Sequence, residues 1–397
     1  MCKFLRVLLA SFFVFSSPVT PLRAEITLPP EVMQAAVEGI NGVYSLDFAT
    51  AEKNIQKVFS LYPDHPFAHF GNAMIAWARY EYEFETSDEK QRKVFEKVLD
   101  DSIEGIKRWL KNNPKDPNAY MGLGALNGLR ALFNMRNRNW VTSYFAGRKA
   151  ISNLETSLKL DPTYYDAYFG LGVYEYFAGT LPAVIKVLAK IVAIKGNPDT
   201  GVRYLNKART FARFTQDSAK LILIQVQNTR GSRFYAPEKS LEYIRELHKK
   251  FPNNPLMGYV EIICLYETGD FKSVSTKASH FLELIGTNPY YKEIYIPRAY
   301  TALGTTEMAQ GNFERARQLF EEGAEKIKKQ DPSRWGVWNA LRLGQVYDVL
   351  GEREKAQKQY RYVLSFKDKW GFDDLAKSLL KTPYKVPAEG VGPLPPI

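Results

Sequence analysis

The chain has 397 residues, of which 45% are hydrophobic and 14% aromatic, and its formal net charge is +11. This composition supplies ample material for a packed interior and excludes a disordered chain. The excess of cations favours anionic surfaces or partners in general, but it does not specify nucleic acid, and we expect no nucleic-acid ligand.

The first 24 residues have the layout of a secretory signal peptide. Two early cations precede an apolar run from Val7 to Phe15, and Leu22-Arg23-Ala24 follows helix-breaking Ser and Pro. A membrane anchor is the alternative, but the apolar run is far shorter than the roughly 20 residues that span a bilayer. We therefore expect cleavage after Ala24 and a periplasmic or secreted protein.

Removal of this leader leaves one cysteine and a net charge of +8, since Lys3, Arg6 and Arg23 lie within it. Cys2 precedes the apolar run, so it is not a lipid-attachment site at the cleavage point. Cys264 lies in the apolar run VEIICLYE, where a buried free thiol is the ordinary expectation. Stability must then come from packing, because neither a disulfide nor a zinc cluster is available.

Hydrophobic spacing after the leader is helical, with apolar residues three and four apart. Recurring stops place Asp or Asn beside Pro, which lacks the amide hydrogen that a helix interior needs but fits a first turn. A shared spacing precedes these stops at Ala51, Ile55, Val58 and Pro63; at Ser102, Ile106, Trp109 and Pro114; at Ala150, Leu154, Ser157 and Pro162; and at Ser240, Ile244, Leu247 and Pro252. Each copy predicts the second helix of a hairpin, with its small residue pressed on the first helix.

The predicted first helices share a Leu-Gly pair. The pairs are Leu123-Gly124, Leu171-Gly172, Leu303-Gly304 and Leu343-Gly344. With GNFERARQLFEEG and GEREKAQKQYRYVL after the last two pairs, the sequence resembles the tetratricopeptide repeat (TPR), whose pattern is Leu-Gly and Tyr followed by a small residue, Phe and Pro. The resemblance covers about residues 31 to 368 and is interrupted between 178 and 235.

This resemblance implies an all-α fold, a right-handed superhelical solenoid of antiparallel helix hairpins in residues 25–382, in an exported bacterial protein. It also implies a non-enzymatic scaffold without a cofactor, which binds a peptide or protein partner in its concave groove. The sequence specifies neither that partner nor the oligomeric state.

Two segments depart from the repeat. Residues 179–208 are expected to form an irregular helical insert, and residues 383–397 have the Pro-rich composition of an unpacked, disordered tail. Within the insert, residues 181–196 predict an amphipathic helix carrying Lys186 and Lys190. This helix either lies on an anionic membrane surface or covers the solenoid with its apolar face, and we favour the second alternative.

Three patterns suggest chemistry but have simpler explanations. GLGALNG (122–128) lacks the preceding strand of a phosphate loop, so close helix packing explains its glycines better. His65 and His69 have the spacing of a metal pair, but Pro66 reads as the first helical residue and leaves His65 outside the helix. The carboxylates between residues 81 and 89 point around a helix and not into one site. We therefore predict neither a catalytic nor a metal site.

Residues 130–150, RALFNMRNRNWVTSYFAGRKA, alternate arginines with aromatic residues. This mixture is typical of binding surfaces. The alternative, which we favour, is a continuing repeat with its aromatic rings inward and its arginines solvated.

The candidate partner-binding residues come from this run and from first-helix positions one or four residues from the Leu-Gly pairs. They are Met121, Arg130, Arg136, Arg138, Phe169, Val173, Tyr176, Trp338, Gln345 and Asp348. Two other classes of function stay open. A scaffold on a membrane surface requires binding to anionic lipid, and an enzyme acting on envelope carbohydrate requires a pocket with converging carboxylates.

Overall fold

The computed structural model describes residues 29–82, 89–137, 139–180, 195–327, 333–366 and 371–394. These residues form α-helices and one 3-10 turn, η2 (Glu293–Tyr295), with no strand among them, which confirms the all-α prediction. The helices are α1 (Pro30–Tyr44), α2 (Phe48–Leu61), α3 (Pro66–Tyr82), α4 (Glu89–Asn112), α5 (Pro117–Arg136), α6 (Trp140–Leu160), α7 (Ala167–Gly179), α9 (Pro198–Phe211), α10 (Gln216–Gln227), α11 (Pro237–Lys250), α12 (Pro255–Glu267), α13 (Phe271–Leu284), α14 (Ile296–Ala309), α15 (Phe313–Ile327), α16 (Arg334–Val349), α17 (Arg353–Leu364) and α18 (Asp373–Lys381). The predicted leader, residues 1–24, lies outside the described residues.

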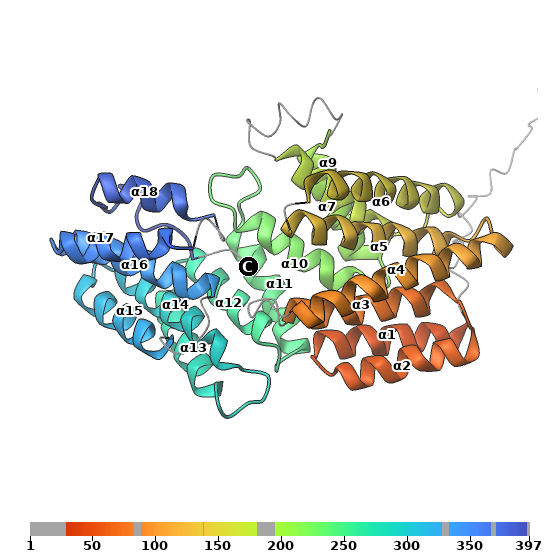
Figure 1. Cartoon of the computed structure of the whole chain (residues 1–397), viewed down its shortest axis with the longest axis horizontal. Coiled ribbons are helices and arrows are strands. Elements are labelled where there is room, and N and C mark those ends of the chain that lie inside the picture. Colours follow the sequence, from red (N-terminus) through yellow and green to blue (C-terminus); the bar gives the residue numbers. More distant parts are fainter. Residues whose placement is uncertain are drawn as a thin grey trace, which may run out of the picture.

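Consecutive helices pack in pairs, and the pairs stack into an elongated array (Figure 1). The pairs are α1–α2, α3–α4, α5–α6, α7–α9, α10–α11, α12–α13, α14–α15 and α16–α17, and α18 packs on α17. First helices also contact the first helix of the next pair, as α3 does α5 and α14 does α16. The predicted TPR-like solenoid of helix hairpins is therefore confirmed.

The Asn-Pro and Asp-Pro stops begin helices as predicted. The Asp116 carboxylate accepts a hydrogen bond from the Asn118 amide at 2.8 Å, while Pro117 occupies the first helical position of α5. Asn197 before α9 and Asn254 before α12 cap their helices in the same way. Each polar side chain satisfies an amide that the first turn leaves unpaired, and Pro adds no such amide.

At the Leu-Gly pairs the two helices of a hairpin approach too closely to admit a side chain on the glycine. A β-carbon added to Gly124 would lie 2.6 Å from the Leu154 side chain, and one added to Gly344 would lie 2.6 Å from the Tyr360 ring. At Gly172 the added carbon would lie 2.9 Å from the backbone nitrogen of Leu205. The predicted phase of the repeats is therefore correct at all three glycines.

The predicted irregular insert is shorter than expected. Helix α9 is a regular second helix that packs on α7, with Leu205 and Ala208 fully buried. Gly201, Leu205 and Ala208 have the same spacing as Ala150, Leu154 and Ser157 of the predicted second helices, but we assigned them to the insert. A side chain at Gly201 would meet the backbone of Tyr176, which explains the glycine. Residues 181–194, with Lys186 and Lys190, lie outside the described residues.

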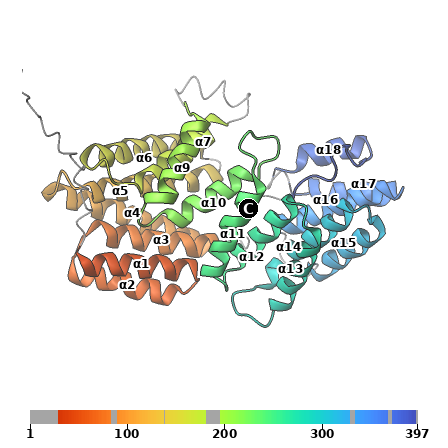
Figure 2. The same ribbon diagram turned by 180° about the vertical axis from the view of Figure 1, so that it is seen from behind.

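The array bends so that its beginning meets its middle (Figure 2). The Tyr44 ring, at the end of α1, stacks on Phe251 with ring centroids 5.0 Å apart. Its carbonyl oxygen accepts a hydrogen bond from the Asn254 side chain at 2.7 Å, and its hydroxyl lies 2.7 Å from that of Ser218. We call α1–α11 the N-terminal half, which these contacts close, and α12–α18 with residues 382–394 the C-terminal half.

Candidate functional site

The end of the chain folds back onto the first helices of the C-terminal half. From α18 it returns across α16 toward α12 and the loop after α10 (Figures 1 and 2). Val391 and Leu394 are only 5% and 2% exposed, and each belongs to a core cluster. The prediction of an unpacked tail is therefore wrong for these residues. We call residues 384–394 the tail and the surface that holds it the tail groove.

Side chains of the groove recognise three consecutive carbonyl groups of the tail. Arg230 donates from Nη1 to the Val391 oxygen at 3.1 Å, and the Tyr266 hydroxyl donates to the Gly392 oxygen at 3.2 Å. Arg342 donates from Nη2 to the oxygens of Gly392 and Pro393, at 3.1 and 2.8 Å. These donors satisfy carbonyl groups that an extended segment does not pair within itself.

Arg342 is the central donor of the groove. It lies on α16, is almost fully buried, and donates from Nη1 to the Gln345 side-chain oxygen at 3.0 Å. Its guanidinium carbon lies 5.4 Å from the centre of the Trp338 ring. Burial lowers the pKa of Arg342, and no carboxylate of the described residues forms an ion pair with it. Its positive charge is therefore stabilised by carbonyl oxygens, an amide oxygen and an aromatic face.

Asp348 holds the beginning of the tail. Its fully buried carboxylate accepts hydrogen bonds from Arg353 at 2.7 Å, from the Tyr360 hydroxyl at 2.7 Å and from the backbone amide of Tyr384 at 2.8 Å. Arg353 also donates to the carbonyl oxygens of Leu379 and Leu380 at the end of α18. Burial, together with the hydrogen bond to Asp348, raises the pKa of Tyr360. This network connects α16, α17, α18 and the tail.

An ion pair on the other side of the groove orients Arg230. Its Nε donates to the buried Glu267 carboxylate at 2.7 Å, and the Tyr235 hydroxyl donates to the same oxygen at 3.0 Å. Burial alone would lower the pKa of Arg230, but the hydrogen bond and charge of Glu267 raise it. The pair leaves Nη1 of Arg230 directed at the tail.

Three predicted partner-binding residues lie at this groove. Asp348 contacts the tail directly, Gln345 contacts Arg342, and Trp338 packs on Arg342 and on Phe372. Arg342 was not among the predicted residues, although it lies on the same helix face between Trp338 and Gln345. Arg230, in the loop after α10, and Tyr266, on α12, were not predicted either, because neither belongs to a recognisable motif.

The predicted residues of the N-terminal half are placed differently. Met121 is buried with Leu154 and Tyr164, and Tyr176 is buried against Gly201, so the expectation that these two face an open groove is wrong. Tight hairpin packing covers both side chains. Phe169 and Val173 are half-buried, and Arg130 pairs with Asp100. The side chain of Arg136 and all of Arg138 lie outside the described residues.

Helix α6 exposes aromatic residues that we expected to point inward. Trp140, Val141 and Phe145 are 63%, 72% and 59% exposed, and Arg148 beside them is also exposed. The favoured interpretation of this run, with its rings inward, is therefore wrong for α6. Helix α6 packs on α5 and α7, but neither helix covers these side chains.

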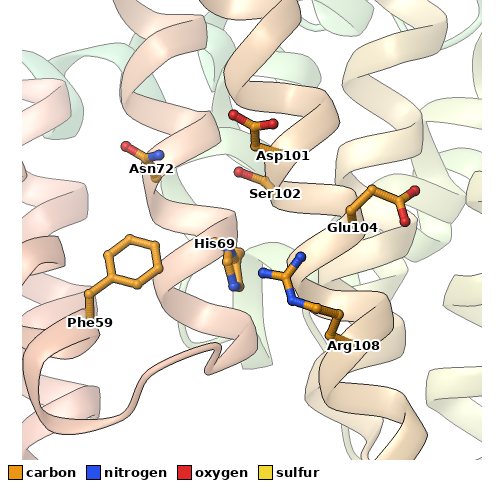
Figure 3. A pocket seen from close by; sticks show the side chains of 7 residues that line it. All are labelled: Phe59, His69, Asn72, Asp101, Ser102, Glu104 and Arg108. Carbon is orange, nitrogen blue, oxygen red and sulfur yellow. The ribbon is translucent and has the colours of Figure 1, made fainter.

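A second hollow, of about 340 Å³, lies between α3 and α4 (Figure 3). His69 is buried in it and its Nε2 lies 3.2 Å from Asp64, whose same oxygen accepts from Arg108 at 2.9 Å. Burial lowers the pKa of His69, and the neighbouring Gly105 leaves the space for its ring. Ser102 lines the hollow but forms no hydrogen bond with His69, so the nucleophile–base contact of a hydrolase is not present among these described residues.

The structure also places His65, Cys264 and part of the run of carboxylates between residues 81 and 89. Helix α3 begins at Pro66, so His65 lies outside it as predicted, and no group of three metal-ligating side chains occurs among the described residues. Cys264 is a buried free thiol, as expected, and burial raises its pKa to about 12. Of the carboxylates between 81 and 89, residues 83–88 lie outside the described ranges. In the part of the chain that the structure describes, no helix has the length and apolar character needed to cross a membrane.

Comparison with known proteins finds no matching family model and no matching curated protein. Solved structures of similar fold include a chain of the APC/C hetero-tetramer Cut9-Hcn1, with 12% identity over 84% of this chain and a TM-score of 0.47; this chain spans about half (52%) of that one. A human IFIT1 dimer with PPP-AAAA gives 12% identity, 90% and 86% coverage and a TM-score of 0.46. PilW, a type IV pilus biogenesis factor, gives 15% identity, 64% and 98% coverage and a TM-score of 0.40. At such identities the likeness concerns the helical fold alone.

Proposed function

We propose that this protein is a non-enzymatic interaction scaffold that binds an extended segment of a protein partner in the tail groove. The observation that carries the proposal is the recognition of three consecutive carbonyl groups by Arg230, Tyr266 and Arg342. Side-chain donors aimed at the main chain of an irregular segment, with pockets for alternate apolar side chains, are a means of binding peptides.

The groove also has the composition of a peptide site. Its floor combines the aromatic rings of Tyr266 and Trp338 with two arginines, residue types that give large contacts with little loss of entropy. The hollow at His69 supports catalysis less well, because Asp64 and Arg108 already satisfy each other there.

Selection of peptides from a random library on the immobilised protein tests this function. We expect the selected peptides to cross-link to α12, α14 or α16, and to bind Arg342→Met at least about tenfold more weakly than the wild type, since bonds to a charged donor are lost. Arg79→Met is the matched control, because Arg79 on α3 pairs with Glu52 on α2, in the hairpins at the other end of the array (Figure 1). Peptides that cross-link elsewhere and bind Arg342→Met with full affinity would contradict the proposal.

An anionic membrane surface is a second candidate partner, supported by the exposed Trp140, Val141 and Phe145 beside Arg148. Apolar and cationic side chains on one helix face favour the interface of an anionic bilayer. Flotation with phosphatidylserine vesicles at low and high salt tests this candidate. We expect wild-type protein to float and Trp140→Ser/Phe145→Ser to remain below; equal flotation of both, or none, removes this candidate.

We also propose that the protein is exported, on the basis of the leader-like residues 1–24. Expression of the full chain in a Gram-negative host, followed by fractionation and amino-terminal sequencing, should give a periplasmic product that begins at Glu25. A full-length cytoplasmic product would contradict this.

A further inference from the structure

We propose that the tail is an exchangeable occupant of its groove, in which Val391-Gly392-Pro393-Leu394 takes the place of a partner segment of the same pattern. That segment is extended, has two apolar residues three positions apart, and has Gly-Pro or similarly small and stiff residues between them. The inference rests on the proposed function and adds to it the chemistry of the partner and a competitor within the same chain.

The apolar anchors of the tail enter two separate clusters. Val391 belongs to a cluster with residues of α14 to α18, whereas Leu394 belongs to a separate cluster that includes Tyr259, Tyr266 and Ala302 of α12 and α14. Pro393 between them is exposed. The groove therefore selects for two apolar side chains three residues apart, whereas the exposed residue before the second anchor contributes through its backbone conformation.

The polar contacts to this part of the tail involve only its main chain. Arg230, Tyr266 and Arg342 bind carbonyl oxygens, which every peptide carries. A different segment with the same two anchors presents the same acceptors in an extended conformation. Pro favours that conformation in the free segment and so reduces the entropy lost on binding.

The chain between α18 and the anchors has the character of a tether. Residues 385–389 are exposed and form no helix or strand. They end in a turn at Gly390, whose φ of +88° suits glycine and whose amide donates to the Pro387 oxygen at 2.9 Å. A short flexible tether holds its ligand at an effective concentration on the order of millimolar. An outside segment must compete with the tail at that concentration.

The experiment measures binding of a fluorescein-labelled peptide of residues 384–394 to the full-length protein by fluorescence anisotropy. The release variant is Val391→Asp/Leu394→Asp, because burial of a carboxylate in either cluster is strongly unfavourable. Its matched control is Ala388→Asp, which adds a carboxylate to the exposed tether. We expect the peptide to bind the release variant at least about tenfold more tightly than it binds the wild type or the control, because the tethered competitor is gone.

Equal affinity for all three folded proteins, including no binding to any of them, would overturn the inference, since it makes the tail a permanent part of the fold. If the release variant fails to fold, as judged by circular dichroism, the milder Val391→Ala/Leu394→Ala pair replaces it under the same criterion. Adding Arg342→Met to the release variant should abolish the gain, and persistence of the gain would place the peptide outside the groove.

The two proposals fail in distinguishable ways. If the labelled peptide binds the release variant but no library peptide binds the groove of that variant, the tail is exchangeable and the partner proposal is wrong. If library peptides bind wild type and release variant equally well through Arg342, the partner site stands and the tail does not compete for it.

Discussion

The two halves of the molecule use the same helix hairpin and differ in what their first helices meet. In the N-terminal half, Tyr44 at the end of α1 reaches α10, α11 and α12, and Met121 and Tyr176 are covered by neighbouring helices. In the C-terminal half, α12 and α16 meet the tail of the same chain. A solenoid repeat therefore specifies the stack, but the bend of the stack and the ends of the chain decide which surface is available for a ligand.

The halves also differ in how they use charge. Arg130 and Asp100 of the N-terminal half form a pair at the surface, with Asp100 69% exposed. The carboxylate of Asp348 in the C-terminal half is fully buried and accepts from three donors, two on α17 and one in the tail. Exposed pairs add little to stability, whereas breaking a buried network leaves groups without partners. We therefore expect the strongest effects of polar substitutions in the C-terminal half.

The largest expected effect is that of Asp348→Asn, which removes the charge that pairs with Arg353 and weakens the bonds of Tyr360 and Tyr384. We predict a loss of about 3 kcal/mol in the free energy of unfolding, measured by urea denaturation. Asp100→Asn, its counterpart in the N-terminal half, should cost less than about 0.5 kcal/mol. Similar losses from Asp348→Asn and Asp100→Asn would show that the charged networks of the two halves contribute equally to stability.

Gly172→Leu tests the packing of the N-terminal half. Its side chain would meet backbone atoms of α9, namely the Leu205 nitrogen and the Gly201 oxygen, at 2.9 and 3.0 Å from the β-carbon. Because backbone cannot move aside without displacing the helix, we expect a loss of about 1–3 kcal/mol by thermal denaturation. Gly128→Leu is the control, since a β-carbon there meets nothing within 4 Å. A neutral Gly172→Leu would overturn the repeat phase.

Mild acid should weaken the N-terminal half through His65 and His69. Burial lowers the pKa of both, with Asp116 near His65 and Asp64 near His69 partly opposing the change. The unfolded chain, with a pKa near 6.5, then binds more protons, so stability is complete above about pH 6.5 and falls as the pH drops below it. The melting temperature should fall between pH 7.5 and 5.5, and fall less in His69→Gln. An equal fall in that variant would exclude His69 as a cause.

The smallest effect is expected on α6. Trp140 is 63% exposed, so Trp140→Ser should change the free energy of unfolding by less than about 0.5 kcal/mol. Trp335 on α16 is only 2% exposed, and we expect Trp335→Ser to lower the free energy of unfolding by about 3–5 kcal/mol. A large loss at Trp140 would mean that another segment of the chain covers it.

The helices, their pairing and the glycines at which they touch could be predicted from the sequence. Those features arise from residues a few positions apart, such as Asp116 with Pro117 or Ala150 with Leu154, so a pattern three or four residues long reports them. The same short-range signal placed Trp338, Gln345 and Asp348 on one face of a first helix. It failed at Gly201, where the pattern was present but lay within the residues that we assigned to the insert.

Which helix faces are open, and which residues cover the others, depends on the tertiary structure. Met121 and Asp348 were both predicted from their positions relative to a Leu-Gly pair. Met121 lies in the core whereas Asp348 binds the tail, because burial depends on helices far away in sequence. The tail is the clearest case. Its Pro and Gly residues indicate an unpacked end, but Arg230 and Arg342, 161 and about 50 residues away, supply the donors that its carbonyl groups need. No local pattern records a contact across that distance.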